Sequence, residues 1–412
     1  MKELCELSNE TWDKAQYFQD RFPYVEIGAI NCENGEIGGV EELMTAEAPS
    51  RAQMVVRAGD LLVSATRPTR NAIAIVPFDV EKAIASTGFL VVRGVRSTLV
   101  APKYLFHALR MEFCTKQFNQ YSSGGNYPAI TKDDFRKIII PLPPLPEQWK
   151  IVAELDAAYA AKRAADEKAT KLLASIDDMV LNELGIAKLP KPDTSLSSRI
   201  FTVPAKEVLN GRLDPIAYQS MRRQFYKNVR AGTYEVLRLN EIVDVDRRQT
   251  DSLDGLRYVG LENINGEDGS YCPTNDKESI STAVLFQKGE ILFPKLRPYL
   301  NKVWLSDFDG AASTEFFPLI PTGVSAEYLI VYLRLTQVAR VMTLLMTGNT
   351  LPRVQLEDVL SLPVPIPPRP VQDRIASTAS SIRAEARKLK ADAAAELDEV
   401  KRGIEMEIAQ ER

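Results

Sequence analysis

The chain has 412 residues, of which 45% are hydrophobic and 26% charged, a composition typical of a soluble globular protein with room for two domains. Its net charge of -4 excludes a uniformly basic nucleic-acid binder, although a basic face can be segregated onto one surface. Cys5, Cys32, Cys114 and Cys272 are scattered without a CxxC spacing, so neither a zinc site nor a disulfide framework is predicted. No signal peptide opens the chain and its longest apolar run is broken by proline, so we expect a cytoplasmic location.

The second half of the sequence repeats the plan of the first, about 230 residues later. Tyr24-Val25-Glu26-Ile27 is echoed by Tyr258-Val259-Gly260-Leu261, and Arg67-Pro68 by Arg297-Pro298. A repeat this long indicates a duplicated domain rather than a solenoid, whose units run to about 20 to 50 residues. Two copies of one module allow a pseudo-twofold axis, so one chain can engage two similar targets.

The first module, residues 1–146, contains short β-branched runs separated by turn residues, which predict strands of a mostly antiparallel sheet. These runs lie at 54–56, 61–63, 72–76 and 89–92. A helix is predicted at 102–110, because proline stands near its start and apolar residues recur at helical spacing. The second module, residues 236–370, repeats the plan with a helix at 326–334, so both modules are predicted to be α+β.

Two long helices are predicted, one after each module, at 147–185 and 371–412. Gly185 is placed to end the first helix, and the second carries apolar residues at steps of three and four that form a seam for another helix. Each helix spans about 55 Å at about 1.5 Å per residue, which is longer than a small domain requires. We expect the two helices to pair as an antiparallel coiled coil, the alternative being two solvated surface helices. Residues 186–235 have no N-terminal counterpart and are predicted to be a linker and a lead-in to the second module.

Few residues suggest catalysis. His107 is the sole histidine and falls within the apolar helix at 102–110, so it is predicted to be a structural residue. No Gly-rich strand-to-helix turn has the spacing of a dinucleotide site or a P-loop. An Asn/Asp-Pro-Pro-aromatic tetrapeptide, which amino-methyltransferases use to hold a flipped base, is also missing. Any chemistry is therefore expected from a partner.

Both modules carry side chains suited to nucleic-acid contacts at matching positions. Arginine forks and asparagine amides can make bidentate contacts to guanine and adenine edges, whereas lysines suit phosphates. Glycine-rich loops let a backbone approach a phosphate, but they can equally serve only to turn the chain. A solvated strand-loop surface is the alternative interpretation of the charged residues. The predicted DNA-binding residues are Arg51, Arg57, Arg67, Arg70, Asn71, Ser123, Gly125, Asn126, Lys288, Lys295, Arg297, Tyr299, Asn301, Lys302, Gly348 and Asn349.

A proline-rich stretch precedes each long helix, at 141–148 and 365–372. It could be a ligand for an SH3-type domain, but proline before a helix more simply fixes the direction in which the helix begins. The loop at 125–131, followed by Pro-Leu-Pro-Pro-Leu-Pro-Glu-Gln and a long helix, resembles the DNA-specificity (S) subunit of type I restriction-modification systems. The resemblance covers nearly the whole chain, and residues 211–218 resemble the lead-in of a target-recognition module. The first copy lacks that lead-in, and the second has Val371-Gln372 in place of Glu-Gln.

The resemblance implies a non-enzymatic reader of a bipartite, asymmetric DNA site. Two similar α/β target-recognition domains, residues 1–146 and 236–370, would be separated by the paired helices in a pseudo-twofold arrangement. The helices would hold two methyltransferase (M) subunits that use S-adenosylmethionine and flip the target base. A restriction (R) subunit, using ATP and Mg²⁺, would join for cleavage. The residues expected to bind these partners are Glu147, Gln148, Ile151, Leu155, Leu389 and Leu397.

Two other functions remain open from the sequence. One is an enzyme acting alone, such as a single-chain methyltransferase or nuclease with an unrecognised site. The other is a structural coiled-coil adaptor with no nucleic-acid role. Methyl transfer by the isolated chain would favour the first, and failure to bind DNA in the presence of methyltransferase subunits would favour the second.

Overall fold

A computed structural model provides the structure of the chain. It describes residues 1–13, 20–77, 80, 82–191, 195, 200–209, 215–253, 255–274, 282–348 and 350–410. The chain forms two compact units, one made of Met1–Ala165 with Ala391–Arg412 and the other of Asp166–Lys390. Each unit therefore combines one module with part of both long helices, whereas the sequence suggested divisions at the helix ends.

The first unit contains two four-stranded sheets. One has the order β1-β8-β5-β6 and is antiparallel throughout, and the other has the order β3-β2-β7-β4 and includes one parallel pair, β2 with β7. The strands are β1 Glu6–Leu7, β2 Arg21–Val25, β3 Glu41–Met44, β4 Ala52–Val56, β5 Leu61–Ser64, β6 Ile73–Ile75, β7 Ala83–Ser86 and β8 Phe89–Arg93. The helices are α2 Pro102–Arg110, α3 Glu112–Tyr121 and α4 Lys132–Lys137, with 3-10 turns η1 Ile27–Ala29, η2 Thr45–Glu47 and η3 Pro68–Arg70.

The second unit repeats this architecture. Its sheets have the orders β10-β17-β14-β15 and β11-β13-β16-β12, again with one parallel pair, β12 with β16, and a small sheet pairs β18 with β9. The strands are β9 Val236–Arg238, β10 Val243–Val245, β11 Gln249–Thr250, β12 Arg257–Val259, β13 Ala283–Phe286, β14 Ile291–Pro294, β15 Trp304–Leu305, β16 Gly310–Ser313, β17 Phe316–Pro321 and β18 Pro363–Pro365. The helices are α6 Ala205–Leu209, α7 Ser220–Arg230, α8 Ala326–Leu333, α9 Thr336–Leu344 and α10 Leu356–Leu360, with 3-10 turns η5 Pro215–Tyr218, η6 Leu239–Glu241, η7 Leu261–Asn263 and η8 Pro298–Leu300.

The predicted α+β class and the predominance of antiparallel pairing are confirmed. The strand and helix predictions for the first module also hold, since α2 has the predicted bounds. One correction is that the strands of each module divide into two sheets instead of one. Within residues 186–235, predicted to be a linker and a lead-in, the later part forms α7, whose Phe225 and Val229 are fully buried in the core of the second unit. Part of the predicted lead-in, residues 210–214, lies outside the described residues.

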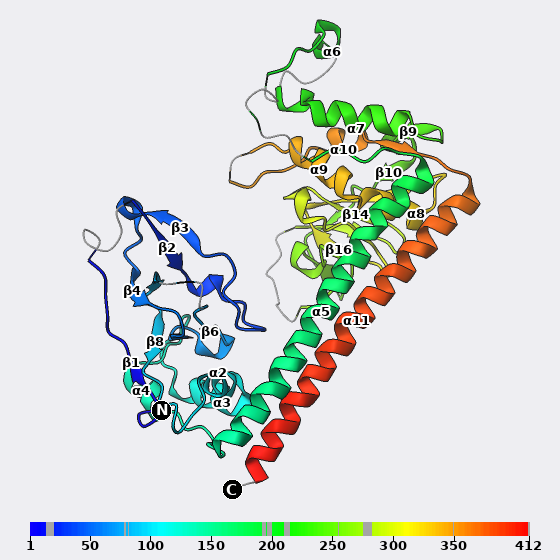
Figure 1. Cartoon of the computed structure of the whole chain (residues 1–412). Helices are drawn as coiled ribbons and strands as arrows, with labels where there is room; N and C mark the ends of the chain where they lie inside the picture. The colour runs from blue at the N-terminus through cyan, green and yellow to red at the C-terminus, as the bar shows by residue number, and fades with distance from the viewer. Residues whose placement is uncertain are drawn as a thin grey trace. The chain divides into compact units, whose positions relative to one another are not determined.

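The long helices are α5 Leu145–Leu184 and α11 Arg369–Gln410. In the first unit the start of α5 lies beside the end of α11 (Figure 1). Lys150 forms an ion pair of 3.2 Å with Glu407, and the Lys401 ammonium lies 5.2 Å from the centroid of the Tyr159 ring. Residue numbers therefore rise on one helix as they fall on the other, which confirms antiparallel pairing.

None of the described helices is long and apolar enough to cross a membrane.

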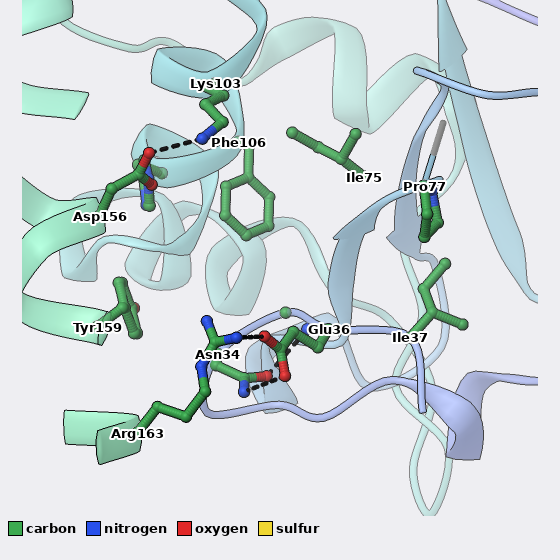
Figure 2. Close-up of a pocket in the computed structure, with 12 residues that line it drawn as sticks. Asn34, Glu36, Ile37, Ile75, Pro77, Lys103, Phe106, Asp156, Tyr159 and Arg163 are labelled. Carbon is green, nitrogen blue, oxygen red and sulfur yellow. Dashed lines mark hydrogen bonds and ion pairs between the residues drawn. The ribbon is translucent and has the colours of Figure 1, made fainter. Parts of the chain in front are cut away.

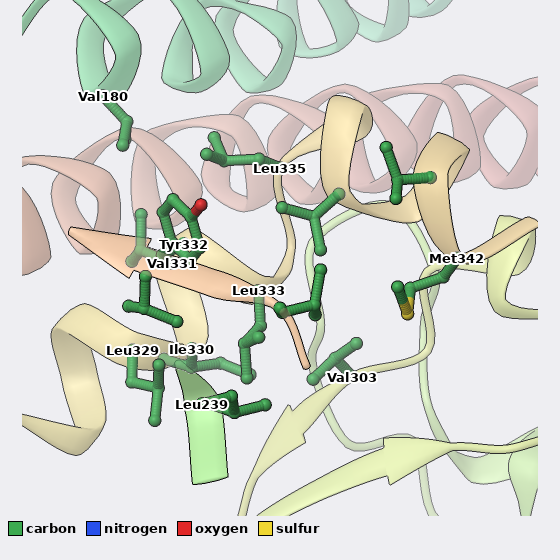
Figure 3. Packing of buried hydrophobic residues seen from close by; sticks show 14 of the residues in the cluster. Val180, Leu239, Val303, Leu329, Ile330, Val331, Tyr332, Leu333, Leu335 and Met342 are labelled. Atoms are coloured by element: carbon green, nitrogen blue, oxygen red, sulfur yellow. The ribbon is translucent and has the colours of Figure 1, made fainter. Parts of the chain in front are cut away.

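The same pairing recurs in the second unit, where Arg374 on α11 bonds Glu183 on α5 at 2.7 Å. The apolar face of α5 here packs against α8 and the small sheet, with Val180, Tyr332 and Leu335 in one buried cluster (Figure 3). Gly185 ends α5 in a left-handed conformation with a φ of 65°, as predicted.

A buried glutamine joins each long helix to its module. The Gln148 side chain accepts a hydrogen bond from the Ala101 amide at 2.8 Å and donates to the carbonyl oxygens of Leu99 and Pro143. Gln372 accepts from the Ser325 amide at 2.9 Å in the second unit. The proline-rich stretches are therefore joints that set the direction of each helix.

Several predicted partner contacts are corrected by this packing. Gln148, Ile151, Leu155 and Leu397 are at most 4% exposed, so their side chains hold the fold together and offer no surface to another protein. Glu147 and Leu389 are only partly buried and keep some accessible surface.

Candidate nucleic-acid interface

The loop that follows β5 has an uncommon backbone conformation, and the loop that follows β14 repeats it. Arg67 and Asn71, which flank η3, have φ values of 48° and 65°. Arg297 and Asn301, which flank η8, have φ values of 48° and 52°. Positive φ is uncommon outside glycine. Among the described residues, these four are the only ones other than glycine with positive φ, so the same loop is built twice.

In the first unit this loop meets a second one. We call residues 67–71 and 123–128 loop pair 1. The Arg67 amide donates to the Pro128 carbonyl oxygen at 2.6 Å, and its guanidinium donates to the Asn126 carbonyl oxygen at 2.9 Å. The same guanidinium lies 4.6 Å from the centroid of the Tyr127 ring, which is 70% exposed. Arg70 is also exposed, so the loop pair presents two arginines and an aromatic ring to solvent.

Loop pair 2 consists of residues 297–301 with 347–348 and 350–352. The Arg297 amide donates to the Pro352 carbonyl oxygen at 3.2 Å, the equivalent of the bond in loop pair 1. Arg297 is exposed and Tyr299 is 49% exposed. Next to this pair, Arg353 binds both carboxylate oxygens of Glu315 at distances from 2.6 to 3.1 Å. Asn349, which we predicted to contact DNA, lies outside the described residues.

A buried arginine at the end of one helix supports each loop pair, and sequence reasoning missed both. Arg110 ends α2, is 7% exposed and donates to the carbonyl oxygens of Asn71 at 3.2 Å and Ile73 at 3.1 Å. The other nitrogen of its fork donates to the carbonyl oxygens of Cys32 and Glu33. The sequence signal that could have identified these two arginines is the Leu-Arg pair that occurs at both 109–110 and 333–334.

Arg334 plays the same part in the second unit. It is 6% exposed and donates to the carbonyl oxygens of Asn301, Val303 and Gly266 at 2.6 to 2.9 Å. Burial lowers the pKa of Arg334 to about 9, so the guanidinium remains charged at neutral pH. The carbonyl dipoles around it offset the cost of burying that charge.

The asparagine amides in these loops contribute to the fold. Asn71 donates to the Arg110 carbonyl oxygen at 3.0 Å, and Asn301 donates to the Arg334 carbonyl oxygen at 2.7 Å. Since an amide group has only two N–H donors, both side chains have part of their capacity committed away from DNA. Each side chain thus also supports the fold, and its role as an adenine reader stays a prediction.

The remaining predicted residues divide by position. Arg51 lies next to the turn at Thr87, at the same end of the strands as loop pair 1, and is exposed. Arg57 follows the other end of β4, about 17 Å away for a five-residue strand, and forms an ion pair of 2.7 Å with Glu10. Lys288 likewise precedes β14, at the end opposite η8. The structure thus separates Arg57 and Lys288 from the loop pairs.

Two lysines near loop pair 2 are also held by the fold. Lys295 donates to the Thr314 carbonyl oxygen at 2.5 Å and lies 4.6 Å from the centroid of the Phe317 ring, and burial lowers its pKa. Lys302 donates to the Leu261 carbonyl oxygen at 2.7 Å. The predicted residues that lie in or beside the loop pairs with exposed side chains or backbone are Arg51, Arg70, Ser123, Gly125, Asn126, Arg297, Tyr299 and Gly348, with Arg67 half-buried beside Tyr127.

A pocket of about 520 Å³ in the first unit contains His107 (Figure 2). His107 is 4% exposed, its Nε2 lies 3.0 Å from Asp156, and its ring stacks on Tyr159. Lys103 bonds the other oxygen of Asp156 at 2.6 Å. Burial lowers the pKa of His107 and outweighs the opposite effect of Asp156.

These contacts confirm that His107 is packed inside the first unit. Glu36, at the rim of the same pocket, is bonded by Asn34 and Arg163. Within the ranges that the structure describes, no group of three or more His, Cys, Asp or Glu side chains is placed to hold a metal ion. The exposed loop pairs are thus the better candidates for a functional surface.

The family described as Type I restriction modification DNA specificity domain matches residues 1–171 and 232–398, which is most of the chain. The chain belongs to this family. The two matched segments agree with the duplication of the loop pairs, one in each segment.

Individual family members are distant in sequence. The chain is 23% identical over 289 residues to the type I restriction enzyme EcoDI specificity subunit of Escherichia coli, covering 68% of this chain and 62% of that protein. It is 29% identical over 119 residues to the type I restriction enzyme HindI specificity subunit of Haemophilus influenzae, covering 28% of this chain and 25% of that protein. The chain therefore spans less than two thirds of the length of these curated relatives.

Solved structures support the fold. One chain, described under "Structural basis underlying complex assembly and conformational transition of the type I R-M system", superposes with a TM-score of 0.52 at 24% identity. The superposition covers 99% of this chain and 94% of that one. The likeness extends over both family segments and both long helices.

Proposed function

We propose that this chain is the sequence-specific DNA-recognition subunit of a type I restriction-modification complex. Each loop pair reads one half of a bipartite, asymmetric DNA site. The observation that carries the proposal is the construction of the same loop twice, with left-handed Arg67 and Arg297 in matching positions, in a chain of the DNA-specificity family. A chain with two similar recognition loops can bind two half-sites at once.

The exposed groups have the chemistry for this task. An arginine fork can donate two hydrogen bonds to O6 and N7 of guanine, the most frequent specific contact in the major groove. Arg67 is already oriented by the Tyr127 ring and the Asn126 carbonyl oxygen, so less side-chain freedom is lost on binding. Arg297 and Tyr299 provide a different set in loop pair 2, which supports different sequences for the two half-sites.

The reaction would be performed by other subunits. We propose that two methyltransferase subunits, using S-adenosylmethionine, bind the paired helices, and that restriction subunits using ATP and Mg²⁺ join the complex. Exposed apolar side chains on the helix pair support a docking surface there, since Trp149 is 51% and Met406 61% exposed. The chain itself contributes recognition and no catalytic group.

The test is methylation mapping in cells that express the chain with its methyltransferase subunit. Methylation of adenine within one bipartite, asymmetric sequence is expected, together with no methyl transfer by the isolated chain. Transfer by the isolated chain would identify an enzyme instead. A folded chain that forms the complex but does not retain DNA would support the coiled-coil adaptor.

A further inference from the structure

Helix α7 carries a basic stripe on its exposed side. Its eleven residues include four cations and no acidic residue. Arg223, Lys227 and Arg230 are exposed, and their spacing of four and three residues aligns them on one face. The opposite face is fully buried through Phe225 and Val229, so the helix cannot rotate the stripe away from solvent.

A shallow hollow of about 720 Å³ runs along this stripe and is partly aromatic. Tyr218 and Tyr226 line it together with the cations. The Arg222 guanidinium lies 5.1 Å from the centroid of the Tyr226 ring, and the Tyr226 hydroxyl lies 3.3 Å from the Ser361 side chain. These contacts fix the wall of the hollow, and the Arg223 guanidinium also donates to the Thr202 carbonyl oxygen at 3.5 Å.

Helix α9 connects α7, which carries the stripe, with loop pair 2. Helix α9 packs against α7 on one side and against η8, the core of loop pair 2, on another. Figure 1 shows α7 and α9 next to each other in the second unit. An α-helix with its side chains is about 10 to 12 Å across, and the stripe lies on the side of α7 that faces away from the buried core, so α7 and α9 together separate it from the loop by about two helix widths.

We propose that the α7 stripe binds the phosphate backbone of DNA beside the half-site read by loop pair 2. The inference rests on the proposed DNA-recognition function. Seven residues of helix extend about 10.5 Å, and one DNA strand carries a phosphate about every 3.4 Å along the axis, so three cations can face about three phosphates. Because these contacts involve no base edge, they add affinity without adding sequence specificity.

The test uses the complex of the full chain with its methyltransferase subunits. The variant Arg223→Gln, Lys227→Gln and Arg230→Gln removes three charges with a good helix former at solvent-exposed positions. Affinity for a duplex with the mapped site is measured from low to high salt. The slope of log K against log salt should become shallower by about 2 to 3, since each phosphate contact contributes about 0.9. The methylated sequence should stay the same.

A matched variant, Arg223→Lys with Arg230→Lys, keeps the charges and should keep the slope. An unchanged slope in the glutamine variant would overturn the proposal. So would loss of complex assembly by the folded glutamine variant, because the stripe would then bind an acidic surface of a protein partner. Failure of the unmodified complex to methylate a defined site would instead refute the proposed function itself.

Discussion

Asn71 and Arg110 exchange hydrogen bonds across 39 residues of sequence: the Asn71 amide donates to the Arg110 carbonyl oxygen at 3.0 Å, and the Arg110 guanidinium donates to the Asn71 carbonyl oxygen at 3.2 Å. Asn301 and Arg334 make the same exchange at 2.7 and 2.6 Å. The loop that follows β5 and the loop that follows β14 are thereby each held by the last turn of a buried helix. If these loops bind DNA as proposed, this support places the exposed arginines before binding.

The first prediction concerns this exchange. Asn71→Ala removes the side-chain hydrogen bond and places alanine, which tolerates the left-handed region less well than asparagine, at a φ of 65°, so it should lower the free energy of unfolding by about 2 to 3 kcal/mol. Asn71→Gly removes the hydrogen bond without this backbone penalty and should lower it by about 1 kcal/mol. Denaturant unfolding of both variants measures the difference. Equal losses would show that the backbone conformation contributes nothing.

The second prediction concerns independent reading. Replacing Arg67 and Arg70 with alanine should relax one half of the methylated site and leave the other intact, and replacing Arg297 and Tyr299 should do the converse. Each lost base contact should weaken discrimination by about 1 to 3 kcal/mol. Methylation mapping of both variants gives the result. Loss of specificity in both halves by either variant, with the chain folded, would contradict two separate readers.

The third prediction concerns acid stability of the first unit. Burial holds the pKa of His107 below its ordinary value of 6.5, so the folded chain binds this proton more weakly than the unfolded chain. Its contribution to stability is complete above pH 6.5 and is lost as the pH falls through the lowered pKa. Thermal unfolding between pH 8 and 5 should therefore show a falling midpoint, with a smaller fall in His107→Gln. The same slope in both proteins would exclude His107 as the cause.

Protonation of Asp156 also lowers the stability of the first unit, but at a lower pH than protonation of His107. Burial alone would raise its pKa, but hydrogen bonds from Lys103 and His107 prevail and lower it. Its contribution is present above the ordinary carboxyl pKa and is lost as the pH falls through the lowered value. Comparing Asp156→Asn with His107→Gln below pH 4 separates the two groups.

The fourth prediction concerns partner docking. Trp149→Ala should weaken assembly with the methyltransferase subunit by at least about 30-fold, because buried tryptophans at interfaces often contribute about 2 kcal/mol or more. Met44→Ala, an apolar residue 41% exposed on β3, is the control and should assemble normally. Analytical ultracentrifugation of the mixed subunits measures both. Leu397→Asp tests a different property, the pairing of the helices, because Leu397 is buried.

The fifth prediction concerns the gap between half-sites. Helix α5 runs without interruption across the boundary between the two units at Ala165 and Asp166. Four residues inserted between Ala164 and Lys168 add about one turn, or 6 Å, and approximately preserve the apolar seam. Since α11 is unchanged, the displacement should be less than 6 Å, and the non-specific spacer should lengthen by about one base pair. An active variant with an unchanged spacer would contradict the idea that the length of α5 sets the distance between the two half-sites.

Local periodicity was enough to predict the elements that carry their own signal. Helix α2 has proline at its start and apolar residues at helical spacing, and its predicted bounds match the structure. The paired helices follow from apolar residues at steps of three and four, and the duplicated modules from matching short segments about 230 residues apart. These features depend on residues close in sequence or on direct comparison of two stretches, so they require no knowledge of tertiary contacts.

The tertiary structure decided which polar side chains remain available for recognition. Arg67 and Asn71 are four residues apart and looked equally suited to base contacts, yet Arg67 faces Tyr127 at the surface while Asn71 bonds the end of α2. Gln148, expected at a partner surface, is buried in the first turn of α5, where it bonds the Ala101 amide. Sequence alone determined where these donors occur, but a donor's partner depends on the residues that folding brings within about 3 Å, and those lie tens of positions away along the chain.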